Sequence, residues 1–202
     1  MVKSTSRNAK ISLDSKQTGR SDEPERDRVR VVALVGFMGA GKTTVGQELA
    51  RQLNWRFDDL DDLIEAAAGT RIGQIFKQSG ENAFREVECS ILASTLAGGD
   101  LPRVLALGGG AFLDAGNQLR LRSKDIATVF LDAPVEELFT RSDQPGVVRP
   151  LRGDRDQFFR LYELRRPEYL KAAFCVQTSG REIGSIVEEI IENLKLERGV
   201  LD

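Results

Sequence analysis

A glycine-rich segment directly after a short apolar run constrains the fold of this chain more than any other feature. The run, VRVVALVG at residues 29–36, is rich in β-branched side chains, which is typical of a strand buried on both faces of a parallel sheet. It continues as GFMGAGKT at residues 36–43, which fits the pattern G-x-x-x-x-G-K-[S/T]. Residues 44–53 then have a helical pattern. Strand, glycine turn and helix in this order predict a phosphate-binding loop.

The residue types in this loop suit the phosphates of a nucleoside triphosphate. Glycines let backbone N–H groups surround the phosphates, and the helix N-terminus adds a partial positive charge. We expect Lys42 to reach the β- and γ-phosphates and the Thr43 hydroxyl to bind Mg²⁺. The predicted ATP-binding residues of the loop are Gly39, Ala40, Gly41, Lys42, Thr43 and Thr44. A glycine-rich turn that binds nothing is the alternative, and the motif does not identify the acceptor.

The composition excludes several other kinds of site. The 202 residues contain no His, so a Ser-His-Asp triad, a Cys-His pair and a histidine-bearing zinc site are impossible. With 29 Lys and Arg against 31 Asp and Glu, the net charge of −2 gives no reason to expect nucleic acid as a partner. No stretch approaches the roughly 20 apolar residues that cross a bilayer, so no membrane partner is expected. Cys89 and Cys175 lie in apolar runs and are predicted to be core residues.

Apolar runs and helical patterns alternate along the rest of the chain. Short apolar runs occur at residues 104–107, 128–131 and 174–176, and residues 183–194 carry apolar side chains at helix spacing. This alternation predicts an α/β fold, doubly wound in three layers around a central parallel sheet with right-handed crossovers. In such sheets, ligands bind beyond the carboxyl ends of the strands.

Two segments are expected to lie outside the packed core. Residues 1–28 have few apolar side chains and are predicted to be a disordered tail, which leaves residues 29–202 as one domain. The tail is too acidic for a typical plastid transit peptide, so we expect a cytoplasmic protein. Residues 142–156 are rich in Pro, Gly and charge. They read either as a solvated surface loop or as a mobile lid whose Arg149 meets phosphates on closure.

Four carboxylates occupy five positions where a second strand should end and a helix begin. They are Asp58, Asp59, Asp61 and Asp62. Capping of the helix would account for Asp61 or Asp62, but four acids exceed what a cap requires. Two acids on one face, one residue apart, could hold hydrated magnesium and a substrate hydroxyl. Spacing does not choose between the face of residues 58, 60 and 62 and the face of residues 59 and 61.

Of two later segments, one carries an arginine and the other a run of three glycines. ENAFREVE at residues 81–88 opens a helical segment, and LALGGGA at residues 105–111 reads as a strand that runs into three glycines. Three glycines leave the backbone bare, so that a ligand can approach it closely. The remaining motifs are VRPL at residues 148–151 and RRPEY at residues 165–169.

Taken together, these motifs resemble those of the shikimate kinase family. The resemblance covers residues 29–196 and rests on GFMGAGKTT, FDDLDDLIE, FRE-VE, LGGGA and VRPL, followed by R-x-P-x-Y. It implies an enzyme that uses ATP and one Mg²⁺ ion to phosphorylate the 3-hydroxyl of shikimate, giving 3-phosphoshikimate and ADP in aromatic amino acid biosynthesis. We expect a monomer, although the sequence itself does not reveal the oligomeric state. The alternatives are another small-metabolite P-loop kinase, such as a gluconate kinase, and a catalytically silent regulatory homologue.

The resemblance also implies roles for individual residues. Alignment on the Ile-Glu that follows the acids gives Mg²⁺ to Asp59 and the acceptor hydroxyl to Asp61. The substrate carboxylate falls to Arg85 and Arg165, whose planar guanidinium groups match it, and the ring to Gly108, Gly109 and Gly110. The implied catalytic residues are Lys42, Asp61 and Arg149. Further implied ATP contacts are Arg149 in the lid, Arg141 over adenine and Arg181 in the adenine loop.

Leu60 departs from the family pattern, which usually has Thr or Ser between the two acids. Its side chain is expected to point away from the face that Asp59 and Asp61 share. If a hydroxyl at this position normally braces the water shell of magnesium, the leucine would weaken metal affinity.

Overall fold

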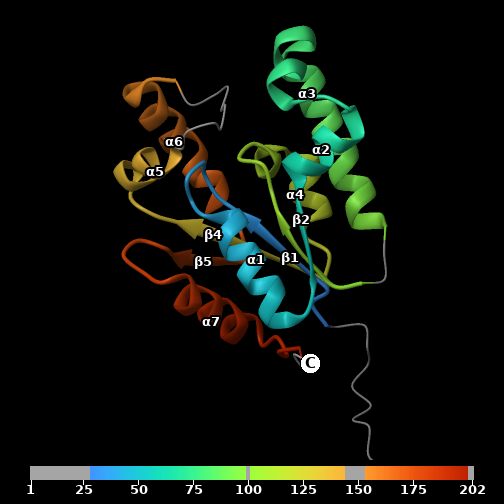
Figure 1. The fold of residues 1–202 in the computed structure, drawn as a ribbon, viewed down its shortest axis with the longest axis vertical. Helices are drawn as coiled ribbons and strands as arrows, with labels where there is room; N and C mark the ends of the chain where they lie inside the picture. The colour runs from blue at the N-terminus through green and yellow to red at the C-terminus, as the bar shows by residue number, and fades with distance from the viewer. Residues whose placement is uncertain (1–27, 99–100, 144–152, 200–202) are drawn as a thin grey trace, which may run out of the picture.

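The computed structural model describes residues 28–98, 101–143 and 153–199. Its centre is a five-stranded, fully parallel sheet with the strand order β2-β3-β1-β4-β5 (Figure 1). The strands are β1 (Val31–Val35), β2 (Arg56–Asp59), β3 (Arg103–Ala106), β4 (Ile126–Asp132) and β5 (Phe174–Gln177). The predicted doubly wound α/β fold is therefore confirmed.

Helices connect the strands and cover both faces of the sheet (Figure 1). They are α1 (Lys42–Leu53), α2 (Leu60–Ala68), α3 (Ile72–Ala97), the 3₁₀ turn η2 (Ala111–Leu113), α4 (Ala115–Arg120), α5 (Val135–Ser142), α6 (Arg155–Tyr169) and α7 (Ile183–Leu194). Helix α1 packs against α7, while α4 packs against α3 and η2 packs against α6. Every strand joins the next through helical segments, as parallel pairing requires.

The central strand β1 sets the position of the site. All five of its residues are buried, because β3 and β4 flank it and helices cover it on both faces. Fully burying an aliphatic side chain of this size contributes roughly 1.5–3 kcal/mol, so the strand is firmly held in the core. Its carboxyl end leads directly into Gly36 and the glycine-rich loop. The loop therefore starts from one of the most firmly fixed points of the molecule.

Helix α3 consists of two parts that meet at Gly80. This glycine has φ 79° and ψ 177°, which is not a helical conformation. A left-handed φ of this kind favours glycine over any residue with a Cβ. The second part of the helix starts at Glu81, where the sequence predicted a helical segment to open, and it carries Arg85 and Glu88.

Both ends of the predicted lid belong to helices. Ser142 is the last residue of α5, and Asp154 caps α6 by accepting a hydrogen bond from the backbone N–H of Gln157 at 2.8 Å. Arg149 lies outside the described residues, as does the predicted tail up to residue 27. The lid and the tail therefore remain predictions.

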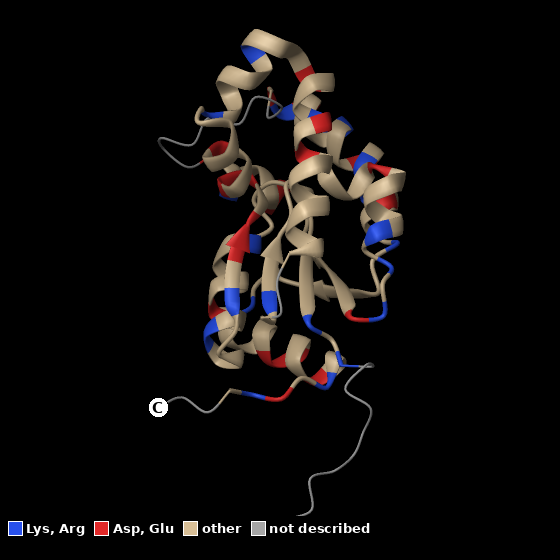
Figure 2. Cartoon of the chain, turned by 90° about the vertical axis from the view of Figure 1, so that its right-hand side faces the viewer, with Lys and Arg blue, Asp and Glu red and all other residues tan. Residues whose placement is uncertain are grey.

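Charged residues of both signs are interspersed along the helices and strand ends in the described part of the chain (Figure 2). This arrangement agrees with the small net charge of the sequence. Within residues 28–98, 101–143 and 153–199, every helix is too short or too polar to cross a lipid bilayer.

The prediction that both cysteines lie in the core is wrong for Cys175, which is exposed, whereas Cys89 is partly buried. The reason lies in the strand order, because β5 forms an edge of the sheet. On this strand only Val176 is buried, while Cys175 and Gln177 point outward. Alternation along an edge strand leaves every second side chain accessible.

Candidate active site

The loop between β1 and α1 has the shape of a phosphate cradle. Gly39 has φ +84°, and a Cβ at this position would lie 2.4 Å from the carbonyl oxygen of Leu138, so only glycine fits. Gly41 is the N-cap residue of α1, and within the described residues no side chain caps this helix end. The first N–H groups of an α-helix lie outside its internal hydrogen-bond ladder, so this helix end suits an anion. The sequence predicted both the loop and its place after the buried strand.

Lys42 extends over this loop. Its Nζ donates hydrogen bonds to the carbonyl oxygens of Gly36, at 2.9 Å, and Phe37, at 3.1 Å. The ammonium group is thus held at the same turn whose N–H groups face the cradle. A lysine in this position can exchange a backbone carbonyl for a phosphate oxygen by a small side-chain movement.

Thr43 and Asp59 meet beside the cradle. The Thr43 hydroxyl donates a hydrogen bond to Asp59 Oδ2 at 2.9 Å, and Asp59 Oδ1 accepts the backbone N–H of Asp61 at 3.1 Å. Asp59 is therefore the N-cap of α2, a role that the sequence analysis considered for Asp61 or Asp62. A hydroxyl and a carboxylate oxygen are ligands that suit Mg²⁺, which completes its shell with water and phosphate. These two residues fit a hard divalent cation.

The other two acids of the cluster lie elsewhere. Asp58 is buried and forms ion pairs with Arg56, at 2.7 Å, and Arg103, at 3.4 Å. Asp62 is exposed on α2. The structure therefore separates the two faces that spacing left open, and Asp59 and Asp61 are the pair beside the cradle. Leu60, between them, is completely buried in the core.

Asp61 has an unusual electrostatic environment. Its side chain is accessible from solvent, but protein atoms crowd the carboxylate, and a Cβ on Gly108 would lie only 2.7 Å from Oδ1. This desolvation is the main cause that raises the pKa of Asp61 to about 6, and the negative charge of Asp59 adds to it, whereas Lys42 acts in the opposite direction. Glu88 and Asp62 raise the pKa further. The carboxylate is therefore more basic than an ordinary one, as a proton acceptor near neutral pH should be.

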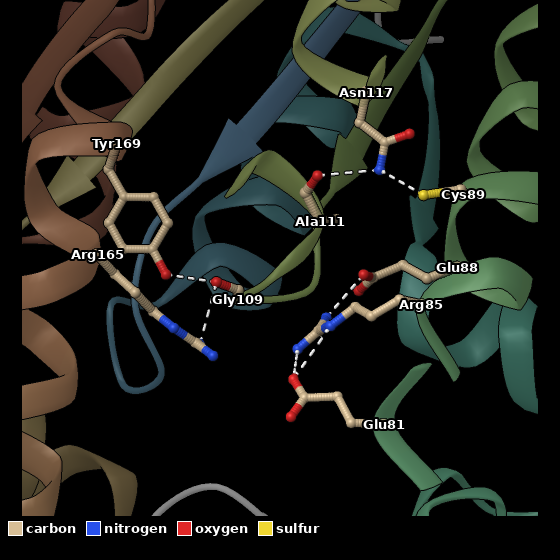
Figure 3. A network of polar contacts seen from close by, with 9 residues as sticks. All are labelled: Glu81, Arg85, Glu88, Cys89, Gly109, Ala111, Asn117, Arg165 and Tyr169. Atoms are coloured by element: carbon tan, nitrogen blue, oxygen red, sulfur yellow. Dashed lines mark hydrogen bonds and ion pairs between the residues drawn. The ribbon is translucent and has the colours of Figure 1, made fainter. Parts of the chain in front are cut away.

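Arg85 approaches the triple-glycine turn from α3 (Figure 3). Its guanidinium donates to Glu88 Oε2 at 2.7 Å and to Glu81 Oε1 at 2.9 Å. Burial opposes the charge of Arg85, but these two acids raise its pKa overall. A Cβ on Gly110 would lie 2.1 Å from Arg85 Nη1, so the guanidinium reaches the turn only because the residue there is glycine.

The Glu88 carboxylate is almost completely buried, with 1% of its side chain exposed. Burial raises its pKa, and the charges of Arg85 and Arg165 act in the opposite direction. Removing Arg85 would leave this carboxylate without its 2.7 Å partner. Glu88 thus helps to fix the direction of the Arg85 guanidinium.

Arg165 approaches the same turn from α6, on the opposite side (Figure 3). Its Nη1 donates to the Gly109 carbonyl at 3.4 Å, and its guanidinium lies 6.0 Å from the ring centroid of Phe37. Tyr169, one helical turn later, also donates to the Gly109 carbonyl. Two arginines from different helices therefore converge on one stretch of bare backbone, which suits a carboxylate held by several donors.

The two arginines predicted to contact adenine have different surroundings. Arg141, on α5, pairs with Glu137 and donates to the hydroxyl and the carbonyl of Thr178, both at 3.4 Å. It therefore lies beside the loop that follows β5. Arg181 pairs with Glu189 and donates to the Ser185 carbonyl at 2.9 Å, so it is directed toward α7. Both ATP roles stay predictions.

Asp132, which ends β4 at the carboxyl ends of the strands, was not among the predicted site residues. This carboxylate is buried and accepts hydrogen bonds from the Tyr162 hydroxyl at 2.9 Å and from Arg166 at 2.7 Å. It thereby ties α6, which carries Arg165, to the sheet. The available signal was an acid at the end of an apolar strand, in the segment IATVFLD.

The fold and the site geometry place this protein in the class of P-loop phosphotransferases. The N-terminus of α1 and Lys42 lie at the carboxyl ends of the strands, and so does Asp61, whose carboxylate has a raised pKa. Residues 38–195 match the family model described as shikimate kinase. The chain therefore belongs to the shikimate kinase family, and it is an ATP-dependent enzyme.

Individual relatives agree with this assignment. A shikimate kinase from Symbiobacterium thermophilum is 41% identical over 173 residues, which cover 83% of this chain and 97% of the relative. One from Persephonella marina is 34% identical over 167 residues, or 83% of this chain and 100% of the relative. A solved structure, shikimate kinase from Acinetobacter baumannii in complex with shikimate, has a TM-score of 0.77 and 32% identity, and the match covers 84% of this chain and 94% of that one.

Proposed function

We propose that this enzyme transfers the γ-phosphoryl group of ATP to the 3-hydroxyl of shikimate, giving 3-phosphoshikimate and ADP for aromatic amino acid biosynthesis. The observation that carries the proposal is the convergence of Arg85 and Arg165 on the Gly108–Gly110 turn, beside the basic carboxylate of Asp61. Such a site suits a small molecule that carries both a carboxylate and a hydroxyl group. The relative from Acinetobacter baumannii, which was solved with shikimate, supports this acceptor.

The acceptor side works through two separate interactions. Arg85 and Arg165 bind the substrate carboxylate with charge-assisted hydrogen bonds, and the glycine turn lets the ring approach closely. Asp61 accepts a hydrogen bond from the attacking hydroxyl and orients it toward the γ-phosphate. Its raised pKa, about 6, makes it a better proton acceptor than an ordinary aspartate. Because phosphoryl transfer has a loose transition state, orientation is as important as proton removal.

The nucleotide side works through charge stabilisation. Lys42 leaves the Gly36 and Phe37 carbonyls to bind the transferred phosphoryl group, while the first N–H groups of α1 bind the other phosphates. Thr43 and Asp59 would hold a single Mg²⁺ ion, which supplies neutralisation of the phosphate charge when bound. These interactions grow stronger as charge develops in the transition state.

Several finer parts of the proposal rest on the sequence. Residues 142–156 would close over the bound nucleotide and bring Arg149 to the phosphates, with Arg141 and Arg181 near the adenine. The disordered tail of residues 1–28, the monomeric state and the cytoplasmic location also remain predictions.

Neither alternative function is favoured. A gluconate kinase would share the cradle but would not need two arginines converging on a triple glycine, and the family to which the chain belongs is that of shikimate kinase. A catalytically silent homologue usually lacks one or more of the charged residues that bind the substrates and the metal. Here Lys42, Asp59, Asp61, Arg85 and Arg165 are all present.

The test is a coupled assay for ADP release with ATP, Mg²⁺ and shikimate, run in parallel with gluconate. We expect turnover with shikimate and little with gluconate. Lys42→Ala should abolish turnover with little change in melting temperature, because this lysine stabilises phosphate charge and does not pack the core. Lys124→Ala is the matched control and should behave like the parent, because Lys124 is exposed and lies just before β4, at the amino ends of the strands. Unchanged turnover in Lys42→Ala would refute the proposal.

A further inference from the structure

Tyr169 joins the hydrophobic core to the substrate turn. Its side chain is completely buried at the end of α6, and its ring lies 5.4 Å, centroid to centroid, from that of Phe130 on β4. The hydroxyl is the part that leaves the core, and it donates a hydrogen bond to the carbonyl of Gly109 (Figure 3). The packed ring therefore aims one polar group at the middle of the triple-glycine turn.

Two donors share this carbonyl. Arg165 lies four residues before Tyr169, so both side chains project from the same face of α6. The Arg165 Nη1 is 3.4 Å from the Gly109 oxygen, which is long for a hydrogen bond. Tyr169 is the second donor to this oxygen. Burial raises the pKa of Tyr169 to about 12, even though Arg165 acts in the opposite direction, so the hydroxyl stays protonated and can donate.

A second buried side chain holds the other end of the turn. Asn117, on α4, is completely buried, and its Nδ2 donates to the carbonyl of Ala111 at 3.0 Å (Figure 3). The glycines have no side chains with which to fix their own conformation. Backbone hydrogen bonds hold the turn from within, from the Ala111 N–H to the Gly108 carbonyl at 3.1 Å and from the Leu113 N–H to the Gly110 carbonyl at 3.0 Å. Side chains add hydrogen bonds from outside to the carbonyls on either side of Gly110.

We propose that Tyr169 is a positioning residue for the acceptor: its hydroxyl binds the Gly109 carbonyl and thereby leaves Arg165 available to the substrate carboxylate. This inference rests on the proposed function, in which Arg165 binds that carboxylate. Without the hydroxyl, the part of the chain that the structure describes offers this oxygen no side-chain donor other than Arg165. The substrate would then compete with the Gly109 carbonyl for Arg165, and this carbonyl would lose its remaining side-chain donor when the substrate binds. Substrate binding would therefore be weaker.

The test is Tyr169→Phe, which removes the hydroxyl and keeps the ring. Tyr162→Phe is the matched control, because this second buried tyrosine of α6 donates instead to Asp132, at 2.9 Å, and to the Ala133 carbonyl, at 3.2 Å. We expect Tyr169→Phe to raise the KM for shikimate, and the dissociation constant measured by calorimetry, by about tenfold, with the KM for ATP unchanged. Tyr162→Phe should leave both KM values within about twofold. Assays run well below the melting temperature of the less stable variant.

A double variant tests the route through Arg165. If Tyr169 acts by freeing Arg165, then Tyr169→Phe should add little to the loss caused by Arg165→Ala, whereas independent effects would multiply. Three outcomes would overturn the inference. The first is that Tyr169→Phe binds shikimate like the parent, and the second is that the loss in the double variant equals the product of the two single losses. The third is that both KM values rise equally in Tyr169→Phe and Tyr162→Phe. In each of these cases the parent still phosphorylates shikimate, so the proposed function survives. A parent without shikimate turnover would refute both.

Discussion

The Thr43 hydroxyl lies 2.9 Å from Asp59 Oδ2, and this hydrogen bond joins the first turn of α1 to the end of β2. The two strands that lead to these residues, β1 and β2, are not neighbours, because β3 lies between them in the sheet. The residues meet because α1 starts, and β2 ends, at the same carboxyl edge. Thr43 and Asp59 would therefore hold a metal where the phosphate loop meets the acid cluster.

Asp59→Asn tests this pair. The amide oxygen can still accept the N–H of Asp61, so the cap of α2 should persist. The amide NH₂ that replaces Oδ2 can donate to the Thr43 oxygen, whereas the negative charge and one metal-binding oxygen are lost. We expect the Mg²⁺ concentration for half-maximal activity to rise by about 10–100-fold, which a Mg²⁺ titration of the initial rate measures. Asp62→Asn, two acids further on and exposed, is the control and should titrate like the parent. An unchanged Mg²⁺ requirement in Asp59→Asn would place the metal elsewhere.

The raised pKa of Asp61 gives a pH dependence with a definite sign. The folded protein binds the proton more tightly than the unfolded chain, whose Asp pKa is about 4. Ionised Asp61 therefore costs stability above about pH 6, and this cost fades as the pH falls through 6 toward 4. Asp61→Asn should accordingly raise the melting temperature at pH 8 and lose that gain near pH 4. Thermal melts of both proteins across this range measure the difference.

The same residue predicts opposite effects on stability and on catalysis. Asp61→Asn should lower kcat by about 100-fold if proton acceptance matters in the transition state, and by less if the role is mainly one of orientation. In the parent, kcat/KM for shikimate should fall as the pH drops below about 6, because the carboxylate becomes protonated. The groups that surround it are Asp59, Lys42, Glu88 and Asp62. A variant with parental kcat and no gain in stability at pH 8 would contradict both assignments.

The sequence predicted what depends on contiguous residues. The glycine-rich loop, its buried strand and the helix after it form one continuous segment, so the motif contains all the information for its geometry. Sequence spacing did not reveal which acids of the cluster face the cradle. One of the two arginines that pair with Asp58 in the interior is Arg103, which lies 45 residues away in the sequence, so local spacing could not show this partner.

Contacts between distant segments also explain the other gaps. Tyr169 bonds to a carbonyl 60 residues earlier, so the motif RRPEY showed the residue but not its partner. Cys175 seemed to be a core residue because its apolar run does not reveal that β5 is an edge strand. Strand order and side-chain partners follow from how elements pack, and local patterns carry little of that information.

Arg85→Ala tests whether Arg85 binds the carboxylate of shikimate. The change removes two charge-assisted donors and leaves Glu88 buried without its partner, so kcat/KM for shikimate should fall by about 100- to 1000-fold. The KM for ATP should hardly change, because Arg85 faces the glycine turn and not the cradle. Steady-state kinetics with each substrate varied in turn separate the two effects.

Arg51→Ala is the matched control for Arg85. Arg51 forms a similar ion pair with Glu48, at 2.7 Å and three residues apart, but in the last turn of α1 on the exposed surface. Its removal should leave all kinetic parameters unchanged, since exposed pairs of this kind contribute about 0–1 kcal/mol. If both variants bind shikimate like the parent, the carboxylate is held elsewhere.

Leu60→Thr tests whether the departure from the family pattern affects the metal. Leu60 lies between the two functional acids, but its side chain is completely buried in the core and so faces away from the Thr43–Asp59 pair. A threonine there loses apolar contacts and buries a hydroxyl, so we expect a loss of roughly 2–4 kcal/mol in the free energy of unfolding. The Mg²⁺ requirement should stay the same, because the new hydroxyl would point into the core.

Leu92→Thr separates general destabilisation from a local effect. Leu92 is equally buried, on α3, away from the Thr43–Asp59 pair, so its variant should lose stability to a similar extent and also keep the parental Mg²⁺ requirement. Chemical denaturation and Mg²⁺ titration of both variants make the comparison. A lower Mg²⁺ requirement in Leu60→Thr alone would mean that a hydroxyl at this position reaches the water shell of the metal. The leucine would then weaken metal binding in this enzyme, contrary to what its burial indicates.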